Sequence, residues 1–187
     1  MGFNLAWFAV HGIDPETFLE RAGFEDTGEA DEYFEAVHSG GDMPDGWYVL
    51  VTDKADLADA ARLAKWSAGG RLIACVILED QMTSLAMEWR DGKQVWSVYW
   101  DGGAEQKQLQ VEGKLPESFE AIHADITALQ AEMNREAGDG DEGDADVVFE
   151  LPLDLAEEIT GFRHDQAGFD EDIPIFNVLE PIHLAED

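Results

Sequence analysis

The chain has 187 residues, of which 45% are hydrophobic, and its 42 acidic and 11 basic residues give a formal net charge of −31. Ten Phe and six Trp supply enough apolar surface for a folded core, which excludes a wholly disordered chain. The negative charge argues against direct nucleic-acid binding and against docking on anionic lipid, because both need clustered Lys and Arg.

The first residues predict a strand followed by a short helix. Residues 3–10 alternate well enough for a strand. Asp14 and Pro15 form a helix N-cap and first position, and Gly23 provides a stop. This start lacks the basic region and the length of a secretory signal, so we expect a cytoplasmic protein.

The next segment predicts a loop and then a crossover unit. Residues 24–46 are acidic, Gly-rich and weakly patterned, and we expect a long loop with a helical turn at 33–37. A strand at 47–51, a helix at 53–68 and the buried strand "RLIACVILE" follow. The only cysteine, Cys75, lies in that strand and is expected to be a small buried side chain; without a second cysteine no disulfide can form within the chain.

The most specific structural signal is the hairpin in "MTSLAMEWRDGKQVWSVYW". Asp91 and Gly92 between two alternating runs predict a two-residue turn that pairs Arg90 with Lys93. In this register one face holds the tryptophans and belongs to the core, and the other face is half polar and meets solvent. Glu88 would then form a surface salt bridge that contributes about 0–1 kcal/mol.

The C-terminal half begins with a strand at 106–111 and a helix opened by Pro116, whose apolar stripe runs from Phe119 to Met133. The segment "GDGDEGDAD", residues 138–146, is predicted to be a flexible acidic linker inside a single domain.

The chain closes with further short elements. "VVFELP" predicts a short strand, Pro152 starts a last helix, and Pro174 marks the start of an edge strand. Together these elements predict one α+β domain over residues 1–187. Its sheet is mixed but mainly antiparallel and is built around the Trp-rich hairpin, with three or four helices covering its core face.

The sequence matches no familiar catalytic motif and only part of one metal-binding motif. No P-loop, dinucleotide fingerprint, nucleophile elbow or zinc-protease motif occurs. Asp139, Asp141 and Glu150 fall at the first, third and twelfth positions of a calcium loop, but Gly143 and Asp144 break its middle. A solvated linker is the favoured interpretation and weak divalent binding the alternative, and we predict no cofactor.

The segment "ITGFRHDQ" has two interpretations. In the structural one, Gly161 ends a helix in the left-handed conformation and Phe162 folds back on the last turn. Arg163 and His164 then complement the negative end of the helix dipole.

In the functional interpretation, the same segment forms a binding site. Arg163 is the only basic residue after Arg135, and it could bind a carboxylate or phosphate group. His164, oriented by Asp165, could act as an acid or base. Trp89 or Tyr99 of the hairpin would complete the pocket.

A "WRDG" hairpin followed by "VWSV", a later "LPLDLAEEITGFRHD" and a short tail resemble a group of small, acidic, uncharacterised bacterial proteins. The resemblance covers most of the chain and implies a compact intracellular bacterial α+β protein. It implies no activity, because none is assigned to that group.

Three functions remain. The leading hypothesis is a non-enzymatic interaction protein that presents its acidic surface to a basic protein, as immunity-type inhibitors and nucleic-acid mimics do. The second is a small enzyme or ligand-binding protein with a site at Arg163, His164 and Asp165. The third is a salt-adapted protein whose charge has no specific partner. The lack of catalytic motifs favours the first, and the oligomeric state is left open.

Overall fold

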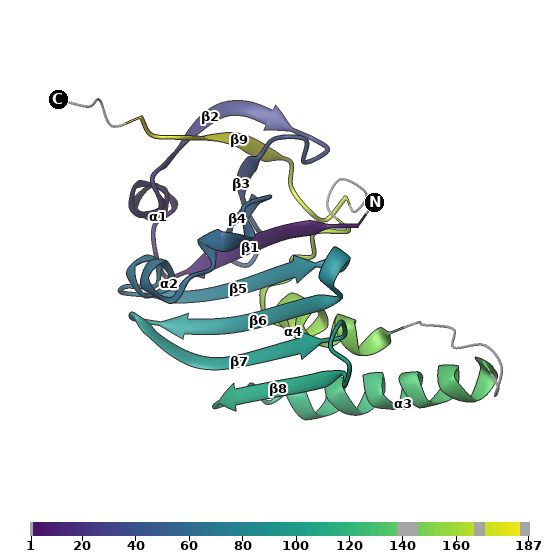
Figure 1. Ribbon diagram of the computed structural model, residues 1–187. Helices are drawn as coiled ribbons and strands as arrows, with labels where there is room; N and C mark the ends of the chain where they lie inside the picture. Colours follow the sequence, from purple (N-terminus) through teal and green to yellow (C-terminus); the bar gives the residue numbers. More distant parts are fainter. Residues whose placement is uncertain (1, 138–145, 167–170, 184–187) are drawn as a thin grey trace.

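The computed structural model describes residues 2–137, 146–166 and 171–183. Within them the chain forms one nine-stranded sheet of order β2-β9-β3-β4-β1-β5-β6-β7-β8, in which all neighbours are antiparallel (Figure 1). The strands are β1 (Asn4–His11), β2 (Phe24–Asp31), β3 (His38–Asp42), β4 (Tyr48–Thr52), β5 (Arg71–Leu78), β6 (Thr83–Arg90), β7 (Lys93–Asp101), β8 (Gln108–Gly113) and β9 (Phe176–Pro181).

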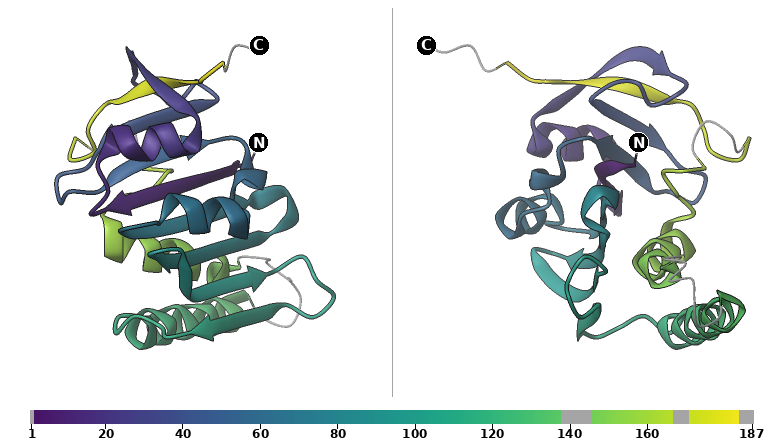
Figure 2. Two further views of the ribbon diagram at one scale, coloured as in Figure 1. Left: turned by 90° about the vertical axis from the view of Figure 1, so that its left-hand side faces the viewer. Right: turned by 45° about the vertical axis from the view of Figure 1, so that its right-hand side comes forward.

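Helices cover both faces of the sheet (Figure 2). One face carries α1 (Pro15–Ala22) and α2 (Ala60–Trp66), and the other carries α3 (Phe119–Ala137) and α4 (Glu150–Thr160). The α+β class and the single sheet are therefore confirmed. The expectation that only one face is covered is wrong. Among the described residues, none of the helices combines the length and apolar content needed to span a bilayer.

Strand β1 lies at the centre and shows why two cores form. Its residues are apolar without alternation, so both of its faces must be covered. Trp7 belongs to the cluster beneath α4, which we call the α4-side core. Phe8 belongs to the cluster beneath α1 and α2, the α2-side core, where Trp66 packs edge to face on it at 5.1 Å.

The predicted boundaries of α1 are confirmed. Asp14 accepts a hydrogen bond from the backbone N–H of Thr17 at 2.9 Å, Pro15 is the first helical residue, and Gly23 caps the end with φ +81°. The helix at 53–68 is shorter than predicted, because Asp59 caps it and a 3₁₀ turn precedes it.

The crossover prediction is confirmed at the level of topology. Strands β4 and β5 both pair antiparallel with β1 and therefore run parallel to each other on either side of it. Helix α2 connects them across the sheet.

Three predictions about the outer strands are wrong. Residues 24–46 form β2 and β3 rather than a loop. The C-terminal strand β9 lies between those two strands rather than at the edge, because Phe176 and Leu179 are buried in the two cores. "VVFELP" forms a 3₁₀ turn and the start of α4, so Pro152 lies inside the first helical turn instead of starting the helix.

The hairpin turn is confirmed, but the register beyond it is not. Arg90 pairs with Lys93 at the turn. After one further pair β7 contains an extra residue, so that Glu88 lies opposite Trp96 rather than Val95. Such a bulge is invisible in a strict two-residue alternation, and it shifts every later pair by one residue.

The bulge changes which side chains share a face. Trp96 and Trp100 lie in the α4-side core, whereas Met87 and Trp89 lie in the α2-side core. The face predicted to meet solvent is therefore buried as well, and Glu88 is only 2% exposed.

Glu88 forms a buried ionic centre instead of a surface salt bridge. It accepts hydrogen bonds from Arg71 Nε at 2.7 Å, from Arg90, and from Trp96 Nε1 at 2.8 Å. Burial by itself would raise the pKa of Glu88. The three donors outweigh burial and lower that pKa below its ordinary value.

Helix α3 covers the sheet with only part of its length. Of the predicted stripe, Phe119 and Ile126 are buried, whereas Leu129 is 47% exposed. Figure 1 shows the C-terminal half of α3 extending beyond the last strand. The α3 stripe is therefore a weaker core element than its periodicity predicts.

Candidate functional site

The segment after α4 closes the helix as the structural interpretation predicts. Gly161 has φ +73°, and its N–H donates to Glu157 O at 2.7 Å. Phe162 is fully buried, and its ring packs edge to face against Trp7 at 5.1 Å and stacks on Phe176 at 5.5 Å. These contacts fix the chain direction after α4, where Arg163 is half-buried, His164 is buried and Asp165 is exposed.

Arg163 lies inside a cluster of carboxylates. It forms ion pairs with Glu150, with Asp154 at 2.5 Å, with Glu157 at 3.5 Å and with Asp165 at 2.9 Å. Its side chain is 12% exposed, and these carboxylates keep the pKa of Arg163 above its ordinary value despite burial. A ligand anion would have to compete with all four carboxylates, so this geometry makes Arg163 a structural cation.

His164 is turned the other way and lines a cavity. The residue is 9% exposed, and its ring packs edge to face against Phe3 at 4.8 Å. Neither ring nitrogen has a hydrogen-bond partner within the described residues. Burial lowers the pKa of His164, while Asp165 acts in the opposite direction.

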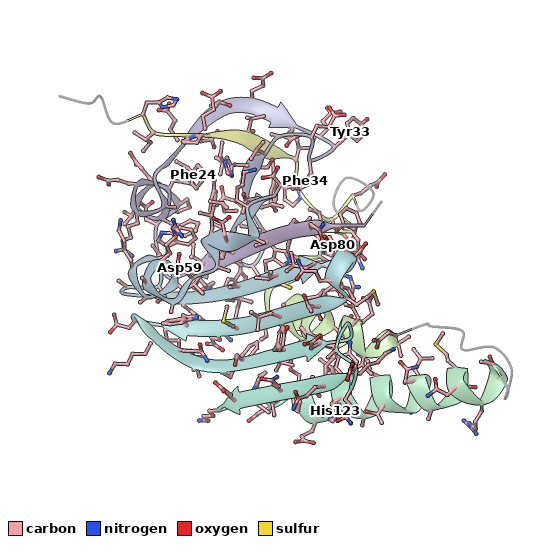
Figure 3. All side chains as sticks on the ribbon, in the orientation of Figure 1. Phe24, Tyr33, Phe34, Asp59, Asp80 and His123 are labelled. Carbon is pink, nitrogen blue, oxygen red and sulfur yellow. The ribbon has the colours of Figure 1, made fainter. Side chains whose placement is uncertain are left out.

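The cavity, which we call the His164 cavity, has a volume of about 330 Å³. It lies between the N-terminal segment, the β2–β3 connection, the end of β4 and the segment after α4. Its lining includes Phe3, Tyr33, Phe34, Ser39, Thr52, Asp53, His164 and Asp165. Figure 3 labels Tyr33 and Phe34 at this end of the sheet.

The hairpin residues predicted to complete this pocket lie elsewhere. Trp89 is buried in the α2-side core, on the opposite face of the sheet from Phe162. Tyr99 lies in β7, paired with Leu85 and Gln110, and does not line the cavity. The structure thus joins His164 and Asp165 to residues from the first 53 positions, a long-range contact that the sequence does not reveal.

The metal prediction receives no support from the residues that are described. Asp139 and Asp141 lie outside them, and Glu150 is paired with Arg163. No group of three or more candidate ligands occurs in the described parts of the chain. Cys75 is buried in β5 as expected, and burial raises the pKa of its thiol.

A second hollow, which we call the acidic groove, lies beside α1 and has a volume of about 460 Å³. Its walls carry exposed carboxylates, and its floor is apolar. The carboxylates are Glu16, Glu20, Glu25, Asp26 and Asp42, and the apolar lining includes Leu19, Phe24, Tyr48 and Ile182. No Lys or Arg is among the described residues that line it.

Tyr48 is the unusual member of the groove. It is 4% exposed, yet its hydroxyl has no hydrogen-bond partner in the described part of the protein. Burial and the nearby carboxylates of Asp26 and Asp42 raise its pKa, so the hydroxyl stays protonated. An unpaired buried hydroxyl beneath five carboxylates is costly for folding alone and therefore marks the groove as a candidate binding surface.

The sequence misses this groove for a local reason. The groove depends on β2, whose sequence "FEDTGEAD" is too polar to predict a strand. Asn177 of β9 holds this edge by donating to both carboxylate oxygens of Asp26 at 3.1 Å. The one available signal was Asp14-Pro15, which correctly places the acidic helix α1 beside it.

Comparison with known proteins adds no assignment. No protein-family model matches the chain, and neither the curated proteins nor the solved structures give a significant match. The resemblance to a bacterial group therefore rests on the quoted segments alone, and function has to be inferred from the geometry of the described residues.

Proposed function

We propose that this protein is a non-enzymatic interaction module that binds a basic protein partner through the acidic groove. The observation that carries the proposal is the combination of five exposed carboxylates, an apolar floor and the unpartnered hydroxyl of Tyr48 in one hollow. A net charge of −31 adds long-range attraction for such a partner and speeds its association.

The groove suits the side chains of Lys and Arg. Their aliphatic stems can cover Leu19 and Phe24, while their charged heads reach the carboxylates on the walls. The basic residue of α1, Arg21, does not compete, because its guanidinium donates to Ala68 O at 2.7 Å.

The adjoining edge of the sheet favours a charged partner over a second copy of the chain. Strand β2 pairs only with β9, and its residues between the buried ends Phe24 and Asp31 are exposed. Its register shifts between Asp26 and Ala30, and Gly28 has φ +72°. Acidic side chains and an irregular backbone both discourage edge-to-edge pairing of like strands. We further propose that the complex forms in a reducing cytoplasm, since Cys75 is buried and unpaired.

The test is capture of partners from lysate of the encoding organism, identified by mass spectrometry. The groove variant combines Glu20→Gln, Glu25→Gln and Asp42→Asn. A matched control combines Glu120→Gln, Glu132→Gln and Glu136→Gln on α3, which removes the same number of charges from another surface.

The proposal predicts a basic protein that wild type and the α3 control capture equally well. The groove variant should capture it about tenfold less, and about 1 M salt should release it. Equal loss in both variants would mean that net charge alone drives binding. Absence of any salt-sensitive partner would favour a salt-adapted protein instead.

A further inference from the structure

We propose that the His164 cavity is a second binding site, and that it takes a small planar aromatic molecule with a ring N–H donor and a positive charge. This site is separate from the acidic groove. Figure 3 shows Phe24 of the groove beside α1, apart from Tyr33 and Phe34 of the cavity.

The first observation is the imidazole itself. Both nitrogens of His164 are buried without a partner in the described chain, and a buried polar group in that state is costly. Because burial lowers its pKa, the ring is neutral near pH 7 and offers one acceptor and one N–H donor. A ligand with a ring N–H can supply the donor that the acceptor nitrogen lacks.

The second observation is the turn that contributes Phe34 to the cavity lining. Phe34 has φ +54°, which is a strained conformation for a bulky side chain. Asp31 stabilises the turn that contains it, because its carboxylate accepts from the backbone N–H of Glu35 at 2.9 Å, from that of Ala36 at 3.2 Å, and from Ser39 Oγ. A strained aromatic residue held by a buried carboxylate indicates a preformed wall.

The third observation is the rim. Tyr33 is 71% exposed, and Phe3 and Val37 are also exposed, although all three line the cavity. Exposed aromatic side chains at the mouth of a cavity suit a planar ligand, which can stack on them.

The charge at the mouth defines the ligand further. Asp53 and Asp165 line the cavity, and none of its described lining residues is Lys or Arg. Lys54 pairs with Asp53 at 3.1 Å and balances its charge, whereas Asp165 shares the single cation Arg163 with three other carboxylates and leaves that group net negative. The net field therefore favours an ammonium group and disfavours a carboxylate or phosphate.

The experiment uses probes that share one ring and differ in charge: tryptamine, indole and indole-3-acetate. Binding is measured by titration calorimetry and by NMR amide shifts of the full chain. We expect tryptamine to bind best and indole-3-acetate worst, with shifts at residues 33–37 and 164–165. Methylating the indole nitrogen of tryptamine should weaken binding about 5- to 10-fold, because the ring N–H donor is lost.

Two variants test the residues. His164→Phe keeps the ring packed on Phe3 but removes both nitrogens, and it should abolish the preference for tryptamine over its methylated form. The matched control is His123→Phe on α3, where the histidine stacks on Phe119 away from the cavity. Asp53→Asn should weaken tryptamine about threefold and leave indole unchanged.

The proposal is overturned if no probe binds at about 10 mM, which is weaker than the weakest affinities expected for a built site. It is also overturned if the anionic probe binds best, or if His164→Phe and His123→Phe behave alike. Should His164→Phe fail to fold, Asp53→Asn and the methylated probe decide the question alone. Neither result depends on capture of a basic protein.

Discussion

Two ionic centres of this protein have opposite compositions. One is a carboxylate, Glu88, bound by Arg71 and Arg90. The other is a guanidinium, Arg163, bound by four carboxylates from α4 and the segment after it. In a chain with 42 acidic and 11 basic residues, cations are scarce, and three of them are used in these two places.

The partners differ as much as the central charges do. The arginines around Glu88 are partly exposed and can turn toward water, but the third donor, Trp96 Nε1, is buried. The carboxylates around Arg163 are all partly exposed and would repel one another without it. Loss of Glu88 therefore leaves an unsatisfied buried group, whereas loss of Arg163 leaves repulsion that salt can screen.

The largest expected effect follows from the first centre. Glu88→Ala should lower the free energy of unfolding by about 3 kcal/mol, because Trp96 loses its acceptor and two cations lose their counter-charge. Urea denaturation measures the change. A loss below about 1 kcal/mol would mean that Glu88 behaves as the surface residue predicted from the sequence.

The second centre should respond to salt. Arg163→Met keeps an apolar stem and removes the charge, and it should lower the free energy of unfolding by about 2 kcal/mol at low salt. Roughly half of that loss should disappear in about 1 M NaCl, where the carboxylates are screened. Glu88→Ala provides the control, because its loss should persist at both salt concentrations.

The pH dependence of the difference between wild type and a Glu88 variant isolates the contribution of this carboxylate. The pKa of Glu88 is lowered in the folded chain, so the unfolded chain binds more protons below the ordinary value of 4.5. The stability from this group is present above pH 4.5 and is lost as the pH falls below it. The stability gap between wild type and Glu88→Gln, followed by thermal unfolding, should therefore shrink in that range. A stability difference that does not change with pH would contradict hydrogen bonds to an ionised Glu88 carboxylate.

The smallest expected effect concerns Lys93. The turn pairs Lys93 with Arg90, next to Glu88 in the register predicted from the sequence, but the ion pairs of Glu88 are with Arg71 of β5 and Arg90 of β6. Lys93→Ala should change the free energy of unfolding by less than about 0.5 kcal/mol. A loss in the free energy of unfolding as large as that caused by Arg90→Ala would indicate that Lys93 interacts with Glu88, as the register predicted from the sequence requires.

The parts of the fold that the sequence predicts are those that depend on local signals. Strong local signals were sufficient for α1, for the turn at Asp91 and Gly92, and for the helix end at Gly161. Each of them depends on a few adjacent residues with special backbone geometry. The bulge depends on packing against two cores at once, which no local pattern encodes.

The candidate site was predicted in part for the same reason. The rare local cluster of Arg163, His164 and Asp165 predicts a site, and His164 and Asp165 line a cavity. Their neighbours Phe3 and Phe34 come from the other end of the chain, so the sequence supplied Trp89 and Tyr99 in their place. The acidic groove was missed because β2 is formed by pairing with β9 and not by its own propensity.

The most direct test of the proposed function is where the captured partner binds. Hydrogen–deuterium exchange of the complex should show protection in α1 and β2, residues 15–22 and 24–31, with α3 unchanged. Protection confined to α3, or uniform weak protection over the acidic surface, would contradict a basic partner held in the acidic groove.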